Sequence, residues 1–231
     1  MFRFKQFNVE HDRSSMKVGT DAVLLASWCN ISHAQTALDV GTGCGVIALM
    51  LAQRNPAVAV DAVDIDPDSI EEAAANFSSS PWHNRLTAQL CDFNTAQFTK
   101  KYDAIVSNPP FFSNGVMSPV EARRNARHTS TLSYARLLSR ARGLLTDNGR
   151  ISIISPVENI KEIIEACTFA SLHISRIISV IPVRGGRTRR VMWEFAPTPC
   201  ETERGVVVIE DCKGVYSQQY RDLCHDFYLK F

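Results

Sequence analysis

The sequence predicts an α/β fold in which helices cover both faces of a mostly parallel β-sheet. From residue 37 onward, short apolar runs of strand length alternate with helical patterns, and this alternation is typical of βαβ units. The first strands are continuous apolar runs, as parallel strands buried on both faces require. Glycine-rich and polar motifs follow these strands directly, which is where ligands bind in such sheets.

Seven strands are expected in this part of the chain. They occupy residues 37–40, 58–64, 86–90, 102–107, 150–155, 173–183 and 190–197. The helices expected between them occupy residues 46–54, 67–77, 132–145 and 156–169. Asp66 is suited to cap the second of these helices, because Pro67 follows it directly. Residues 146–149, TDNG, predict a turn before the fifth strand.

The chain is expected to form a single domain made of three stretches. Residues 1–36 combine turn chemistry with an apolar helix, and they should cover one wall of the ligand site. Residues 37–197 form the core, and residues 198–231 add a strand and a helix packed on the same domain. No apolar run approaches the roughly 20 residues of a membrane span, and the N-terminus lacks an apolar signal core. A cytoplasmic protein is therefore expected.

Composition excludes some classes of protein. The 231 residues carry a formal net charge of +1 and seven cysteines, none in a C-x-x-C pair. Neither a disulfide framework nor a zinc site is expected, and no metal is needed. Positive charge is concentrated in residues 123–128, RRNARH, and residues 184–190, RGGRTRR. Local basic segments of this kind are able to hold a polyanion.

The motif DVGTGCG, residues 39–45, lies between the first strand and the first helix. Gly41, Gly43 and Gly45 allow a sharp turn and close approach of a ligand. A Walker loop needs Lys followed by Ser or Thr after its last glycine, and a dinucleotide loop needs G-x-G-x-x-G. Neither pattern occurs here. With Asp39 two residues before the first glycine, the motif favours the loop of an S-adenosylmethionine-dependent methyltransferase over a nucleotide-binding or purely structural loop.

Carboxylates end the next two strands. Asp64 could accept hydrogen bonds from both ribose hydroxyls of a nucleoside cofactor, and Ile65 would then lie against the adenine face. Asp92 could accept the adenine amine, with Phe93 nearby for packing. The alternatives remain that Asp64 merely caps a helix and that Asp92 is an exposed loop aspartate.

The most specific motif is NPPF, residues 108–111, which follows the fourth strand. An aromatic amine is a poor nucleophile and needs acceptors for its two protons. The side-chain oxygen of Asn108 and the backbone carbonyl of Pro109 could supply them, while Pro109 and Pro110 stiffen the chain. Phe111 offers a face for stacking a planar base, worth roughly 1–3 kcal/mol. An ordinary Asn-Pro turn is the alternative.

These motifs resemble those of Rossmann-like class I methyltransferases of the amino-methylating branch. More closely, FKQFNVEHDRSSMKVGTDAVLLASW, NPPFFSNG, ARHTSTLSY and the ending DFYLKF resemble the family that methylates adenine N6 in the anticodon loop of valine tRNA. The resemblance implies a seven-stranded class I fold, S-adenosylmethionine as cofactor with S-adenosylhomocysteine as product, and adenine 37 as the target. It also implies that Lys17, Gly19, Thr20 and Asp21 line the cofactor pocket.

A tRNA anticodon stem-loop is the expected partner, and nothing in the sequence indicates an obligate protein partner. Two sets of basic side chains are candidates for RNA contacts, although solvated surface charge is an equal alternative for each. They are Arg123, Arg124, Arg127, His128, Arg184, Arg187, Arg189 and Arg190.

Other functions stay open at this point. A methyltransferase acting on rRNA adenine or on a protein glutamine amide would use the same Asn-Pro-Pro-aromatic motif. The glutamine-modifying proteins carry a helical domain before the glycine loop, and only 38 residues precede Asp39 here. A non-catalytic RNA-binding protein and a nicotinamide dehydrogenase are further alternatives.

Overall fold

A computed structural model of the protein describes residues 1–14, 16–109 and 132–230. The strands in these ranges are β1 (Phe2–Arg3), β2 (Asn8–Val9), β3 (Thr36–Val40), β4 (Ala59–Asp64), β5 (Leu86–Leu90), β6 (Tyr102–Ser107), β7 (Leu145–Pro156), β8 (His173–Val183), β9 (Arg190–Ala196), β10 (Glu203–Cys212) and β11 (Val215–Tyr216). The helices are α1 (Thr20–Trp28), α2 (Val46–Arg54), α3 (Pro67–Ser78), α5 (Tyr134–Leu144), α6 (Ile160–Phe169) and α7 (Gln218–Cys224), with 3-10 turns η1 (His83–Arg85) and η2 (Val157–Asn159).

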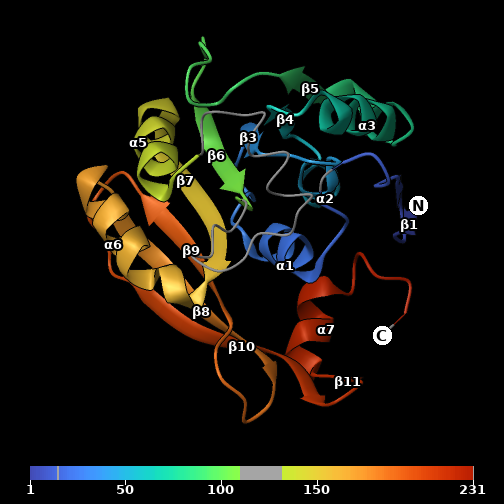
Figure 1. Cartoon of the computed structure of the whole chain (residues 1–231), viewed down its shortest axis with the longest axis vertical. Coiled ribbons are helices and arrows are strands. Elements are labelled where there is room, and N and C mark those ends of the chain that lie inside the picture. Colours follow the sequence, from blue (N-terminus) through green and yellow to red (C-terminus); the bar gives the residue numbers. More distant parts are fainter. Residues whose placement is uncertain (15, 110–131, 231) are drawn as a thin grey trace, which may run out of the picture.

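One mixed sheet organises the described residues (Figure 1). Its nine strands follow the order β11-β10-β8-β9-β7-β6-β3-β4-β5. The strands from β7 to β5 are parallel to one another. β9 runs antiparallel between β7 and β8, β10 is parallel to β8, and β11 is antiparallel to β10. The expected mostly parallel sheet is therefore confirmed.

The expected number of seven strands was wrong for the described residues. β10 and β11 extend the sheet, so the strand expected in the tail joins the central sheet through its pairing with β8. The expected turn at residues 146–149 lies inside β7. There the pairing of Tyr102 with Leu145 jumps to that of Ala104 with Arg150, so the intervening residues bulge out of the ladder.

Two apolar cores fill the layers on either side of the sheet. α1, α2, α7 and one side of α3 cover one face, with buried side chains such as Leu24, Leu49 and Phe77. α5 and α6 cover the other face, where Leu137 packs with Trp193 of β9. Because helices cover both faces of the sheet, ligands are expected to bind at the carboxyl ends of its strands.

In the part of the chain that the structure describes, no helix is long and apolar enough to cross a membrane. Within those same residues, His, Cys, Asp and Glu side chains form no group of three or more suited to hold a metal ion.

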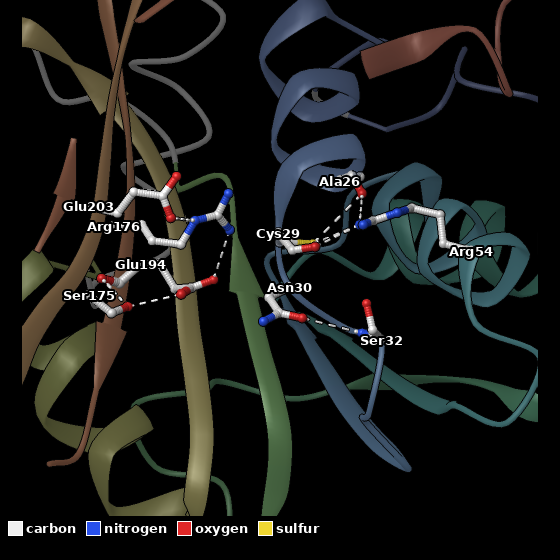
Figure 2. Close-up of polar contacts among 9 residues, drawn as sticks. All are labelled: Ala26, Cys29, Asn30, Ser32, Arg54, Ser175, Arg176, Glu194 and Glu203. Atoms are coloured by element: carbon white, nitrogen blue, oxygen red, sulfur yellow. Dashed lines mark hydrogen bonds and ion pairs between the residues drawn. The ribbon is translucent and has the colours of Figure 1, made fainter. Parts of the chain in front are cut away.

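Polar contacts at the amino ends of the parallel strands fix α1 against both α2 and the sheet (Figure 2). Arg54, the last residue of α2, donates to the carbonyl oxygens of Ala26 (2.7 Å) and Cys29 (2.8 Å), which are orphan acceptors at the end of α1. On the sheet, the guanidinium of Arg176 lies 3.3 Å from the carboxylate of Glu194 and 4.3 Å from the ring centroid of Trp28. α1 is thus held in place at this end.

We predict that Arg176→Leu destabilises the protein strongly. Glu194 is only 2% exposed, and losing its cationic partner leaves a buried carboxylate uncompensated, which costs about 3–5 kcal/mol. The exposed Glu203 also pairs with Arg176, at 3.4 Å. Glu203→Gln is the matched control and should cost less than about 1 kcal/mol. Denaturant unfolding measures both, and equal costs would contradict the prediction.

Candidate active site

The carboxyl ends of four neighbouring parallel strands meet at one edge of the sheet, in the order β6, β3, β4, β5. Hydrogen bonds join these ends to one another. The hydroxyl of Ser107, at the end of β6, donates to the carbonyl of Val40 at 2.8 Å. The N–H of Cys91, just after β5, donates to the carbonyl of Asp64 at 2.9 Å. The structure therefore brings the glycine loop and the three polar motifs predicted from the sequence to the same edge.

The glycine loop between β3 and α2 is held against the end of β4. Gly41, Gly43 and Gly45 all have positive φ, at 74°, 54° and 85°. The N–H groups of Gly41 and Thr42 donate to the carbonyl of Val63 at 2.9 and 3.0 Å. A Cβ placed on Gly41 or Gly43 would meet no atom of the described residues within 4 Å. The loop thus turns sharply and leaves open space beside its first two glycines.

The side chain of Asp64 connects the glycine loop to the residues before α3. Its carboxylate accepts from the N–H of Gly43 at 2.9 Å and from the N–H of Asp66 at 3.0 Å. Burial raises the pKa of Asp64, and these hydrogen bonds partly oppose the rise. Asp66 is the N-cap residue of α3 as predicted, although its side chain accepts from the hydroxyl of Ser69, at 2.8 Å, rather than from a backbone N–H.

Asp39 lies fully buried in β3, on the face covered by α2. One carboxylate oxygen accepts from the hydroxyl of Thr42 at 2.6 Å and from the N–H of Ala48 at 3.2 Å. The other oxygen, Oδ1, is buried with no hydrogen-bond partner among the described residues. Burial raises the pKa of Asp39 to about 7, and nearby Asp64 adds to the rise.

Asp92 and Phe93 follow β5 at the same edge. The Oδ1 atom of Asp92 accepts from the backbone and side-chain nitrogens of Asn94, at 2.8 and 3.0 Å. The ring of Phe93 is buried in the core below α5, and the guanidinium of Arg140 lies 5.5 Å from its centroid. Asp92 is therefore held by an Asx-type turn, and Phe93 contributes to the packing beneath it.

Asn108 and Pro109 follow β6, next to the end of β3. Asn108 is partly exposed, yet its side-chain oxygen is buried and accepts no hydrogen bond within the described ranges. Pro109 is buried. The other two residues of the motif, Pro110 and Phe111, lie outside the described residues. A buried acceptor without a partner is rare in proteins, so this oxygen is available to a donor that the described residues do not supply.

The residues of KVGTD lie at the beginning of α1. Lys17 is exposed, and Gly19 and Thr20 line a cavity with Tyr216 and Tyr228. Asp21 accepts from Nε of Arg190 at 2.8 Å, which links α1 to the first residue of β9.

Two buried residues of α3 that the sequence did not single out hold the N-terminal segment at the site. The carboxylate of Glu72 accepts from the N–H groups of Arg13 and Ser14, at 2.9 and 2.8 Å. The amide of Asn76 donates to the carbonyls of Glu10 and Cys44, both at 2.8 Å. Burial raises the pKa of Glu72, but its hydrogen bonds outweigh that effect and lower it. In the sequence, only the spacing of four residues, which places both side chains on one face of a helix, could have indicated that they act together.

The candidate arginines fall into three groups. Arg184 pairs with Asp211, with Nε at 2.9 Å from Oδ1, and Arg190 pairs with Asp21 as described. Arg187 and Arg189 are exposed and take part in no ion pair with any described residue. The remaining candidates, Arg123, Arg124, Arg127 and His128, lie outside the described residues.

The fold and its site define a class I methyltransferase. A solved predicted O-methyltransferase from Agrobacterium tumefaciens superposes with a TM-score of 0.70 at 17% identity, covering 90% of this chain and 96% of that one. A TehB-like S-adenosylmethionine-dependent methyltransferase from Corynebacterium glutamicum superposes with a TM-score of 0.53 at 17% identity, covering 80% of this chain and 90% of that one. The family model of the methyltransferase small domain matches residues 13–168.

Comparison with curated relatives identifies the family within this class of methyltransferases. The tRNA1(Val) (adenine(37)-N6)-methyltransferase of Vibrio vulnificus strain YJ016 is 39% identical over 99% of this chain and 95% of its own length. The protein of the same name from Aeromonas hydrophila is 41% identical, over 99% and 97%. The chain belongs to the tRNA1(Val) (adenine(37)-N6)-methyltransferase family, which confirms the resemblance seen in its motifs.

We predict that Gly45→Ala costs more stability than Gly41→Ala. Both variants place a side chain at positive φ, which costs about 1–2 kcal/mol. At Gly45 the new Cβ would also lie 2.5 Å from Cε1 of the buried Phe77, and this overpacking adds about 1–3 kcal/mol. Thermal and denaturant unfolding of the two variants provide the comparison. Equal losses would mean that Phe77 of α3 does not pack closely against Gly45.

We predict that Asp39→Asn changes the pH dependence of stability. Asp39 has a pKa near 7 in the folded state against 3.8 unperturbed, so its protonation favours folding at low pH. That contribution is complete below about pH 4 and is lost as the pH rises through 7. The free energy of unfolding of the variant, relative to the parent, should therefore rise between pH 5 and pH 8. Asp147→Asn, at an exposed aspartate, is the reference, and parallel curves for parent and Asp39→Asn would refute the prediction.

Proposed function

We propose that the protein transfers a methyl group from S-adenosylmethionine to the exocyclic N6 amine of adenine 37 in tRNA1(Val). The observation that carries the proposal is the buried side-chain oxygen of Asn108 at the end of β6, beside the glycine loop, which has no hydrogen-bond partner among the described residues. The activity named for the full-length relatives agrees with that chemistry.

The residues at the sheet edge fit a nucleoside cofactor. Gly41 and Gly43 border open space, and the Asp64 carboxylate is fixed in place by two backbone N–H groups while it keeps further acceptor positions. We assign the cofactor to the glycine loop, Asp64, Ile65 and Asp92, with the beginning of α1 as the covering wall. S-adenosylmethionine supplies a sulfonium methyl group that is already activated, so the task of the protein is to position the acceptor amine.

Asn108 and Pro109 prepare the nucleophile. The lone pair of an adenine amine is delocalised into the ring. The Asn108 side-chain oxygen and the Pro109 carbonyl each accept a hydrogen bond from one N–H of the amine, which favours a tetrahedral nitrogen whose lone pair is available. When the nitrogen takes the methyl group, S-adenosylhomocysteine leaves and the methylated amine releases one proton to solvent. The hydrogen bond from Ser107 to Val40 fixes the end of β6, which Asn108 follows directly. Because proline has a restricted φ, the second acceptor stays aimed as well.

The target adenine must unstack from its neighbours to reach this edge, and the free-energy cost of unstacking is lowest in a single-stranded loop. We assign Phe111 to stack on the flipped base. The exposed arginines of the turn between β8 and β9 bind backbone phosphates, which positions the RNA without reading its sequence.

We predict that Asn108→Ala lowers methyl transfer to unmodified tRNA by about 100-fold or more, the scale for losing one group that stabilises a transition state. Labelled S-adenosylmethionine, purified tRNA and nucleoside analysis would show N6-methyladenosine with the parent protein only. Asn148→Ala, at an exposed asparagine in the bulge of β7, is the control and should keep full activity.

Two results would contradict the proposal. If the parent labels a protein extract or ribosomal RNA but not tRNA, the amine chemistry stands and the substrate is wrong. If the parent binds no S-adenosylmethionine in calorimetry and labels nothing, the methyltransferase assignment itself fails.

A further inference from the structure

A cavity of about 590 Å³ opens between the beginning of α1, the end of β8, and the β10–β11–α7 unit. Aromatic side chains from both ends of the chain line it, together with aliphatic residues and one charge of each sign. The lining residues are Phe2, Val18, Gly19, Thr20, Pro182, Val183, Ile209, Glu210, Tyr216, Tyr220, Tyr228 and Lys230. A volume of this size is within the range of sites for small organic groups, about 300–1,000 Å³.

The walls of this cavity are fixed by contacts between the two ends of the chain. Phe4 forms a β-bridge with Tyr228, and the N–H of Lys5 donates to the carbonyl of Phe227 at 2.8 Å. The rings of Phe2 and Tyr228 meet edge to face, with centroids 6.2 Å apart. The ring of Tyr220 lies 6.3 Å from that of Tyr228 and 5.2 Å from that of Tyr216. The aromatic lining is therefore preformed, which lowers the entropic cost of binding a flat ligand.

The cavity lies at the same edge of the sheet as Asn108. β9 begins at Arg190, which pairs with Pro156 at the end of β7, and β7 is parallel to β6. The end of β8 and the turn that follows it are consequently at the carboxyl edge. The ion pair between Asp21 and Arg190 joins this turn to α1. A polymer bound over Asn108 could reach this cavity by crossing the ends of β7 and β9 along the same edge.

The charges indicate what kind of group enters. Glu210 contributes a carboxylate to the lining, which accepts from the N–H of Gly214 at 3.0 Å and disfavours an anion inside the cavity. Outside the cavity, the turn between β8 and β9 carries the exposed Arg187 and Arg189. Lys230 is one of the lining residues. Neutral aromatic surface within and cations around it match a nucleotide whose base enters while its phosphates stay outside.

We propose that this cavity receives an unpaired base of the substrate RNA other than the target adenine, and that Tyr216 is one of the rings it stacks on. Gly19 and Thr20, which belong to the wall assigned to the cofactor, separate the two sites, and the base enters on the side of Tyr216. The proposal rests on the proposed function, because it takes RNA as the substrate. It adds a second base-binding site that fixes the register of the anticodon loop over Asn108.

Binding of an anticodon stem-loop RNA tests the proposal, with Tyr216→Ala and Tyr216→Phe compared with the parent. Stacking on one ring predicts that Tyr216→Ala weakens RNA binding about tenfold, whereas Tyr216→Phe binds like the parent. Phe169→Ala is the control, because Phe169 is a 76% exposed aromatic residue at the end of α6, outside the cavity. Affinity for S-adenosylmethionine should be the same in all four proteins.

Single abasic substitutions at each unpaired position of the stem-loop identify the bound base. One of them should weaken binding to the parent about tenfold and add nothing to the loss in Tyr216→Ala, which is the signature of a direct contact. If Tyr216→Ala unfolds, Val183→Trp gives an independent test. Val183 is 37% exposed and lies in β8, where it pairs with Glu210, the residue of β10 that also pairs with Tyr216. The larger side chain should fill the cavity next to Tyr216 and weaken binding similarly.

The outcomes separate this proposal from the proposed function. If the parent methylates tRNA while Tyr216→Ala and Val183→Trp bind RNA as the parent does, the base-binding site is refuted and the proposed function stands. If the parent is a dimer in solution and the variants are monomers with unchanged RNA binding, the cavity is an interface between copies and the proposal is overturned. If the parent neither binds RNA nor methylates it, both fail together.

Discussion

The attachment of the glycine loop to the end of β4 is the constraint on which the rest of the site depends. The N–H groups of Gly41 and Thr42 share the carbonyl of Val63, and the N–H of Gly43 reaches the carboxylate of Asp64. These bonds are possible only because three glycines adopt positive φ. They direct α2 back across the sheet, where Arg54 caps the end of α1. One loop therefore determines both the ligand edge and the position of the helices that cover it.

Buried hydrogen-bond acceptors at the carboxyl edge of the sheet reduce the stability of the fold. Asp39, Asp64 and Asn108 all present oxygens that are buried or partly buried, and both Asp39 Oδ1 and Asn108 Oδ1 lack a partner within the described residues. Burial raises the pKa of both carboxyl groups. A fold selected only for stability would replace such groups by apolar side chains. Their concentration at the ends of β3, β4 and β6 is what distinguishes a reactive site from a structural turn.

The strands and the position of the site could be predicted because local signals and the topology agree. Buried parallel strands are continuous apolar runs, and ligand motifs must follow them, so DVGTGCG, Asp64 and Asn108 were placed correctly at one edge. The pairing of strands that are distant in the sequence could not be predicted. The two-residue strand β11 has no periodicity, and the joining of β10 to β8 depends on a crossover rather than on composition. Arg190 was predicted to contact RNA from its charge alone, and its ion pair with Asp21 links residues 169 positions apart.

The two ends of the chain explain how a general methyltransferase fold acquires a particular substrate. The family model of the methyltransferase small domain covers residues 13–168, whereas the relatives named for tRNA1(Val) match 99% of the chain. The likeness to this family therefore extends over residues before 13 and after 168, beyond the methyltransferase small domain. Most residues lining the cavity beside α1 come from those two stretches, among them Phe2, Val183, Tyr216 and Tyr228. On the two proposals above, the core would supply the chemistry of the amine, and the added β10–β11–α7 unit, next to the N-terminal strand, would supply the surface that holds a second base of the RNA loop.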